Sequence, residues 1–110
     1  MPAYAILALA IICEVVATSA MKAAEGFTRP GPSALVILGY AAAFFFLSQV
    51  LDRIPLGIAY AIWAGGGIAL VGLVAWVVYG QRPDLAGFAG MGLIVAGVLV
   101  LNLFSKTSAH

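Results

Sequence analysis

Residues 4–21 have the sequence YAILALAIICEVVATSAM, an apolar stretch in which Glu14 is the only side chain that ionises at neutral pH. As an α-helix, a stretch of this length rises about 27 Å, close to the hydrocarbon thickness of a bilayer. It therefore predicts a membrane-spanning helix with a carboxyl group near the bilayer centre. A carboxylate at that depth costs at least about 2.5–3.5 kcal/mol. We therefore favour a binding role for Glu14 over the alternative, a protonated group that only joins two helices.

The composition of the whole chain indicates the same class of protein. Of its 110 residues, 65% are hydrophobic and 8% are charged, whereas soluble domains carry about 25% charged residues. We expect an integral membrane protein with a single domain, residues 1–110, and no cleavable signal peptide. The net charge of +1 provides no surface for nucleic acid, and a lone cysteine, Cys13, excludes an intrachain disulfide. We expect no metal, no other cofactor and no enzymatic activity.

Three further apolar stretches follow the first one, which covers about residues 4–21. They lie at about residues 33–51, 54–79 and 86–104. Each is long enough to cross the bilayer as a helix, and none shows the alternating segments of about ten residues that barrel strands require. The predicted fold is all-α, with four transmembrane helices.

Four helices of this size do not easily enclose a solvated path, so we expect an oligomer. The fourth stretch offers an interface, because Gly90 and Gly97 lie seven residues apart and close to one helical face. Small residues let helices approach closely in lipid. Glycine is also common in transmembrane helices generally, but we favour dimerisation.

The charged residues of the connections give almost no preferred orientation. An even number of spans places both termini on one side, together with Arg53 and Lys106, and places Lys22, Arg29 and Arg82 on the other. The terminal amine can level this count, which leaves hardly any positive-inside signal. A chain without bias can insert both ways, and two oppositely oriented copies can form an inverted-repeat dimer, an architecture found in many secondary transporters.

The neighbours of Glu14 predict a binding site for a lipophilic cation. On the same stretch, the neighbours at helical spacing include Ala10, Ile11, Ala17 and Thr18. The small side chains among them leave room beside the carboxyl for a ligand or a second helix.

Aromatic residues on the second and third stretches complete this prediction. Tyr60 and Trp63 share a helical face, as do Tyr40, Phe44 and Leu47. Aromatic faces attract cations by about 2 kcal/mol or more in a dry site. Tyrosine and tryptophan also form interfacial belts or fill cores, but the depth of Tyr60 and Trp63 favours the cation site.

The chain also contains four runs that resemble a known family. They are CEVVATSAMK from Cys13, EGFTR from Glu25, IPLGIAYAIWAG from Ile54 and GQRPDL from Gly80. These runs are similar to those of the small multidrug resistance family, and the similarity extends over the whole chain. The resemblance implies an antiparallel homodimer in the bacterial inner membrane that exports hydrophobic cationic drugs in exchange for protons.

The resemblance also implies a role for individual residues. Glu14 is implied to be the shared proton and drug site. The implied aromatic lining is Tyr40, Tyr60 and Trp63. The implied kink of the third helix, which the run Gly65-Gly66-Gly67 also predicts as a weak point, is at Gly65 and Gly67. The implied dimer contacts are Gly90 and Gly97.

Two positions concern the substrate. The family commonly has serine where this chain has Ala43, and the missing hydroxyl affects drug preference rather than the transport mechanism. The related guanidinium exporters have a tryptophan three residues after the glutamate. Here that position is Ala17, followed by Thr18, which favours the multidrug branch.

The expected function is proton-coupled antiport of lipophilic, often quaternary, cations by alternating access. Desolvation and a second Glu14 in the dimer both disfavour the charged carboxylate, so protons and drug compete for it. A guanidinium exporter of the same family is the alternative. A proton-conducting ring subunit also carries a midmembrane carboxyl, but such subunits are usually hairpins without an aromatic cluster. A purely structural role would leave Glu14 unexplained.

Because the charge count is nearly balanced, we expect the protein to insert in both orientations in roughly equal amounts. Single cysteines placed in the connections of a Cys13→Ser background, labelled from each side of the membrane, measure the two populations. Labelling from one side alone would contradict the dual topology.

Overall fold

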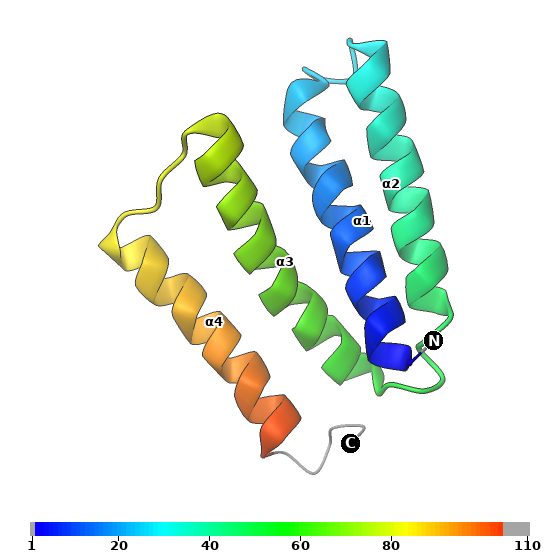
Figure 1. The fold of residues 1–110 in the computed structure, drawn as a ribbon, viewed down its shortest axis with the longest axis vertical. Coiled ribbons are helices and arrows are strands. Elements are labelled where there is room, and N and C mark those ends of the chain that lie inside the picture. Colours follow the sequence, from blue (N-terminus) through cyan, green and yellow to red (C-terminus); the bar gives the residue numbers. More distant parts are fainter. Residues whose placement is uncertain (1, 105–110) are drawn as a thin grey trace. The chain divides into compact units, whose positions relative to one another are not determined.

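In a computed structural model, which describes residues 2–104, the protein consists of four α-helices. They are α1 (Ala3–Ala23), α2 (Pro30–Ser48), α3 (Leu56–Tyr79) and α4 (Leu85–Leu103), shown in Figure 1. Each helix is long and apolar enough to cross a membrane. The prediction of an all-α fold with four such helices is therefore confirmed.

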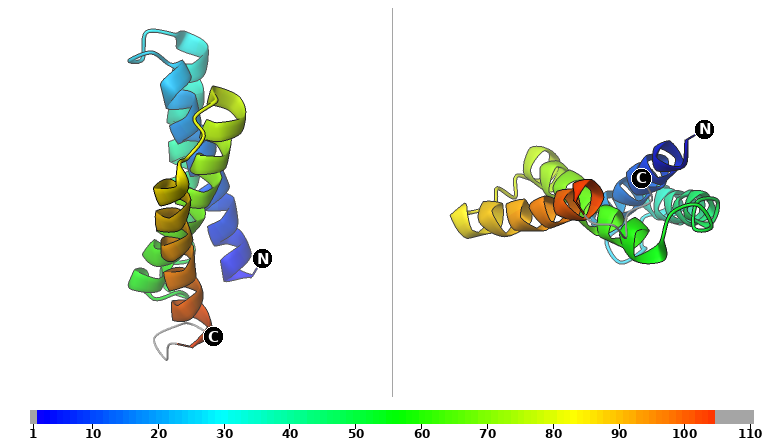
Figure 2. Two further views of the ribbon diagram at one scale, coloured as in Figure 1. Left: turned by 90° about the vertical axis from the view of Figure 1, so that its left-hand side faces the viewer. Right: turned by 90° about the horizontal axis from the view of Figure 1, so that it is seen from below.

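The chain divides after Val50 into two compact units, and each unit is a helical hairpin. The first contains α1 and α2, which lie side by side along their lengths (Figure 1, Figure 2). The second contains α3 and α4. Lys106, which enters the count of orientation charges, lies outside the described residues.

Local sequence explains where the helices begin and end. Pro30 is the first residue of α2, and Pro55 directly precedes α3. A proline suits the start of a helix because its missing N–H has no partner there. Asp84 caps α4, since its carboxylate oxygen Oδ1 accepts a hydrogen bond from the Gly87 N–H at 2.8 Å. Gly80 ends α3 in the left-handed region with φ of 69°, a conformation that glycine adopts without a steric penalty.

Small residues bring the helices of the first hairpin close together. Gly39 on α2 faces Ala17 and the carbonyl of Cys13 on α1 at distances that leave no space for a side chain. Apolar side chains of α1 are buried at three- and four-residue intervals, Leu7, Ile11 and Val15 among them. Helices in lipid gain from such close backbone approach because van der Waals packing drives much of their association.

The second hairpin has a comparable close contact. A Cβ atom placed on Gly65 would lie 2.5 Å from Cγ2 of Val98 on α4, so a larger residue there would force Val98 or the helices to shift. Nearer the connection, the rings of Trp76 and Phe88 pack edge to face with their centroids 5.5 Å apart. No residue of α4, all of which lies in the described part of the chain, is buried. The rest of its surface is free to contact lipid or another protein chain.

The two glycines Gly80 and Gly57 form a matched pair for a stability test. In both places a Cβ atom would meet nothing within 4 Å beyond the local helix backbone, but only Gly80 has a positive φ. We expect Gly80→Ala to lower the free energy of unfolding by about 1 kcal/mol, and Gly57→Ala, inside α3, to raise it by a few tenths. Reversible unfolding in detergent micelles measures both, and a loss of equal size in the two variants would contradict this explanation.

Candidate functional site

Glu14 lies in the middle of α1, and its side chain is half-buried. One helical turn further along, the Thr18 hydroxyl donates a hydrogen bond to the Glu14 carboxylate oxygen Oε1 at 2.6 Å. A bond between positions i and i+4 follows directly from helix geometry, because these residues are neighbours on one face. The carboxyl therefore has a polar partner within its own apolar helix.

A second hydroxyl extends this contact to α2. The Tyr40 hydroxyl lies 2.6 Å from the Thr18 hydroxyl oxygen. Thr18 has a single hydroxyl proton, and it donates that proton to Glu14. Tyr40 must therefore donate to Thr18, which gives a chain of hydrogen bonds directed from Tyr40 through Thr18 to the Glu14 carboxylate. Each bond in such a chain strengthens the next by polarisation.

The same hydrogen-bond chain can also accommodate a protonated Glu14. A protonated carboxyl is a donor, and both hydroxyls can donate as well as accept. With the proton on Glu14, the chain can reverse, so that Glu14 donates to Thr18 and Thr18 donates to Tyr40. Either charge state then keeps a hydrogen-bonded carboxyl. This matters because an unpaired polar group in an apolar environment is energetically costly.

The predicted aromatic lining is divided between the two hairpins. Tyr40 packs against Phe44 on α2 in a stacked geometry, with ring centroids 6.0 Å apart and an interplanar angle of 16°. Tyr60 and Trp63 belong to α3 in the second hairpin, where Tyr60 is 74% exposed and Trp63 is half-buried. The structure thus brings Tyr40 to the carboxyl, while the contribution of Tyr60 and Trp63 stays a prediction.

The small residues predicted to surround the carboxyl are packed rather than open. Four of the six predicted neighbours are buried and two, Thr18 and Leu47, are half-buried; the buried ones are Ala10, Ile11, Ala17 and Ala43. Ala17 lies against Gly39 of α2. Of the two occupants that its small size allowed, a ligand or a second helix, the structure places the second helix there.

The glycines that the sequence singled out occupy two kinds of position. Gly65 and Gly67 are buried in α3, which is a single α-helix through both residues. Gly90 and Gly97 are exposed on α4, where a Cβ atom would meet nothing within 4 Å beyond the local helix backbone. The kink and the dimer contacts stay predictions.

Two residues of the site have roles that the sequence reasoning missed. Thr18 was predicted only as a small neighbour, although its spacing of four residues from Glu14 indicates a hydrogen bond. Gly39 was not singled out at all. A glycine directly before Tyr40 in an apolar helix is a weak signal, since glycine is common in transmembrane helices.

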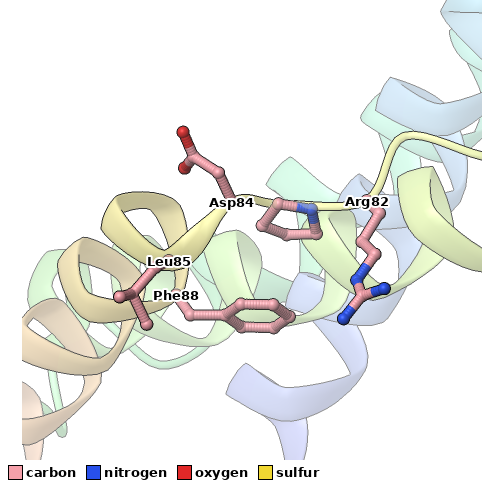
Figure 3. Close-up of a pocket in the computed structure, with 5 residues that line it drawn as sticks. Arg82, Asp84, Leu85 and Phe88 are labelled. Atoms are coloured by element: carbon pink, nitrogen blue, oxygen red, sulfur yellow. The ribbon is translucent and has the colours of Figure 1, made fainter.

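A cavity of about 410 Å³ lies at the connection between α3 and α4 (Figure 3). Its lining residues are Arg82, Pro83, Asp84, Leu85 and Phe88. The Arg82 guanidinium lies 5.8 Å from the centroid of Trp76, and Asp84, which points away from Arg82 in Figure 3, caps α4. Arg82, Asp84 and Phe88 thus make local structural contacts, and none of the lining residues belongs to the predicted site.

Four apolar helices, one of which carries a half-buried carboxyl, define a multi-pass membrane protein. Residues 2–94 match the family model of the Small Multidrug Resistance protein. The chain is 56% identical to the quaternary ammonium compound-resistance protein QacE of Escherichia coli over the full length of both. It is 60% identical to QacF of Klebsiella aerogenes over 94% of each, and 51% identical to the multidrug transporter EmrE of Escherichia coli K12 over 97% of each. The protein therefore belongs to the Small Multidrug Resistance family, as the resemblance predicted, and such relatives indicate a transporter rather than an enzyme.

The hydrogen-bond chain predicts different outcomes for two substitutions of Thr18. Thr18→Val keeps the branched shape but removes the hydroxyl, so Glu14 and Tyr40 both lose a partner, and we expect a loss of about 1–3 kcal/mol in the free energy of unfolding. Thr18→Ser keeps the hydroxyl and should lose less. Unfolding of both variants in the same detergent compares them, and equal losses would contradict the chain.

Proposed function

We propose that the protein is a proton-coupled antiporter that exports lipophilic and quaternary ammonium cations by alternating access. In this proposal Glu14 is the shared binding site of proton and drug. The observation that carries it is the chain from Tyr40 through Thr18 to Glu14, with both oxygen–oxygen distances at 2.6 Å. This arrangement can hold the carboxyl in either charge state, which a residue that alternately binds a cation and a proton requires.

The chemistry of exchange follows from charge. An ionised Glu14 supplies the counter-charge that a permanent cation needs in a site of low dielectric constant. With the carboxyl protonated, the same cation would be buried without a partner, which is costly. A proton that arrives from the opposite side therefore displaces the cation, and the cation displaces the proton. The rings of Tyr40, Tyr60 and Trp63 add cation–π attraction in the proposed site.

The names of relatives support this substrate class. QacE is a quaternary ammonium compound-resistance protein, and a relative in Salmonella typhimurium that is 52% identical to the chain is a putative ethidium bromide resistance protein. Both names refer to permanent cations. The packing at Ala17 points the same way, because a Cβ atom on Gly39 would already lie 2.8 Å from that of Ala17. Guanidinium exporters have a tryptophan at the position of Ala17, and the close contact with Gly39 leaves no space for so large a side chain at position 17.

We further propose that the working unit is an antiparallel homodimer in the bacterial inner membrane. The nearly balanced charges of the connections support dual insertion. The lack of buried residues in α4, with Gly90 and Gly97 open, leaves a surface for a second copy. In the dimer, all four helices of each chain act as one transport domain, Gly65 and Gly67 allow α3 to bend, and the two inverted subunits exchange conformations around the site.

Binding of ethidium at a series of pH values tests the role of Glu14. We expect affinity to rise with pH while the carboxyls ionise and to level off once both are charged. Binding should release protons, at most one from each Glu14 carboxyl of the proposed dimer, because the cation takes the place of a bound proton. A pH dye in a weakly buffered detergent sample detects the release.

Two glutamine substitutions provide the comparison. Glu14→Gln cannot ionise, so its binding should be weak and independent of pH, and proteoliposomes should show no proton-driven transport. The matched control is Glu25→Gln in the exposed connection between α1 and α2, which should behave like the native protein. Proton-driven uptake that survives Glu14→Gln would overturn the proposal. Electrophysiology on proteoliposomes, with a quaternary ammonium ion compared with guanidinium, then distinguishes the two substrate classes.

A further inference from the structure

Gly39 marks the place where α2 comes closest to the backbone of α1 beside the carboxyl. A Cβ atom on Gly39 would lie 2.8 Å from the Cβ of Ala17, 3.1 Å from the Cys13 carbonyl oxygen and 3.3 Å from the Ala17 Cα. Two of these three atoms are backbone and cannot rotate away. The absence of a side chain at Gly39 is therefore what permits this approach.

The contact is in register with the hydrogen-bond chain. Each residue of the contact directly precedes a member of the hydrogen-bond chain. The three residues of the contact are Gly39, Ala17 and Cys13. The members that follow them are Tyr40, Thr18 and Glu14. The point of closest approach thus lies one residue away, along each helix, from the residues that carry the two hydroxyl groups.

We propose that Gly39 is a positioning residue, which acts with Ala17 to bring the Tyr40 hydroxyl onto Thr18 and so completes the hydrogen-bond chain to Glu14. The assignment deepens the proposed function, since its consequence for transport rests on that function. The hydrogen bond itself can be measured without any transport assay.

The distances show why one methyl group matters. An ordinary contact of a Cβ atom begins at about 3.4 Å, so an alanine at position 39 must move away from Ala17 by roughly 0.6 Å. The distance between the Thr18 and Tyr40 hydroxyl oxygens is now 2.6 Å. If α2 moved away from α1 by the same amount, this distance would exceed the usual upper limit of about 3.0 Å for hydroxyl hydrogen bonds. A small change in helix spacing is therefore enough to break the chain at Tyr40.

Nuclear magnetic resonance of protein labelled at the tyrosine Cζ carbon, in lipid bicelles, reports the Tyr40 hydrogen bond directly. Tyr40→Phe identifies the Tyr40 signal. We expect Gly39→Ala to shift this signal to the position of a tyrosine that no longer donates to Thr18. The matched control is Gly31→Ala on the same helix, where a Cβ atom meets nothing within 4 Å beyond the local helix backbone. An unchanged Tyr40 signal in Gly39→Ala would overturn the proposal.

A compensating substitution separates positioning from general damage to the fold. Ala17→Gly combined with Gly39→Ala moves the methyl group from α1 to α2 and removes the closest of the three contacts. We expect the Tyr40 signal of this double variant to return toward the native position. The double variant also tests the positioning role if Gly39→Ala alone does not fold. A folded double variant without the native Tyr40 signal would overturn the proposal.

Ethidium binding then tests the functional consequence. Tyr40→Phe keeps the aromatic ring but removes the hydroxyl, so we expect it to weaken binding by about fivefold in the native background, the ratio for one net hydrogen bond. In the Gly39→Ala background the same change should cost less than about twofold, because the hydroxyl no longer reaches Thr18. Equal costs in the two backgrounds would overturn the positioning role. Ethidium binding that does not respond to Glu14→Gln would instead overturn the proposed function, and the Tyr40 signal would still decide the role of Gly39.

Discussion

The placement of one half-buried carboxyl group within an apolar hairpin is the constraint on which the rest of this protein depends. A charged group in the hydrocarbon core of a bilayer is expensive even on the most lenient scale, and Glu14 is the only side chain between residues 4 and 21 that ionises at neutral pH. The hairpin offsets this cost with hydroxyl groups rather than with a cation. A lysine or arginine partner would hold the carboxyl permanently ionised, whereas Thr18 and Tyr40 can accommodate both the ionised and the protonated forms.

The hydroxyl chain in turn requires a close approach of two helices. A threonine can reach Glu14 from the same helix, but a tyrosine on α2 reaches Thr18 only if the backbones come close together. Gly39 and Ala17 provide that proximity, and Ala43 and Ala10 are buried in the same hairpin. Apolar packing and polar chemistry are thus coupled here, since the small residues that let the helices associate also place the second hydroxyl group.

The second hairpin leaves most of the surface of α4 uncovered. Gly65 and Val98 fix one close contact, and Trp76 and Phe88 fix another, but no residue of α4 is buried in the described chain. In water, such an exposed apolar surface would promote aggregation. In a bilayer it can face lipid at no hydrophobic cost, and it can equally face another helix whose small residues permit close packing. The homodimer and the aromatic contribution of α3 remain proposals that this surface and these residues support.

The sequence by itself determined the class of protein, the number of helices and the position of Glu14 midway along the first of them, because apolar length and charge are properties of consecutive residues. Family membership followed from runs such as CEVVATSAMK for the same reason. The tertiary structure alone showed that the Tyr40 hydroxyl reaches Thr18 and that Gly39 lies directly against Ala17 and Cys13. The physical reason is that these helices are apolar on every side, so no pattern of polar and apolar residues tells which face meets a neighbour. Only the packed hairpin reveals that the side of α2 carrying Gly39 and Tyr40 lies against Ala17 and Thr18 of α1.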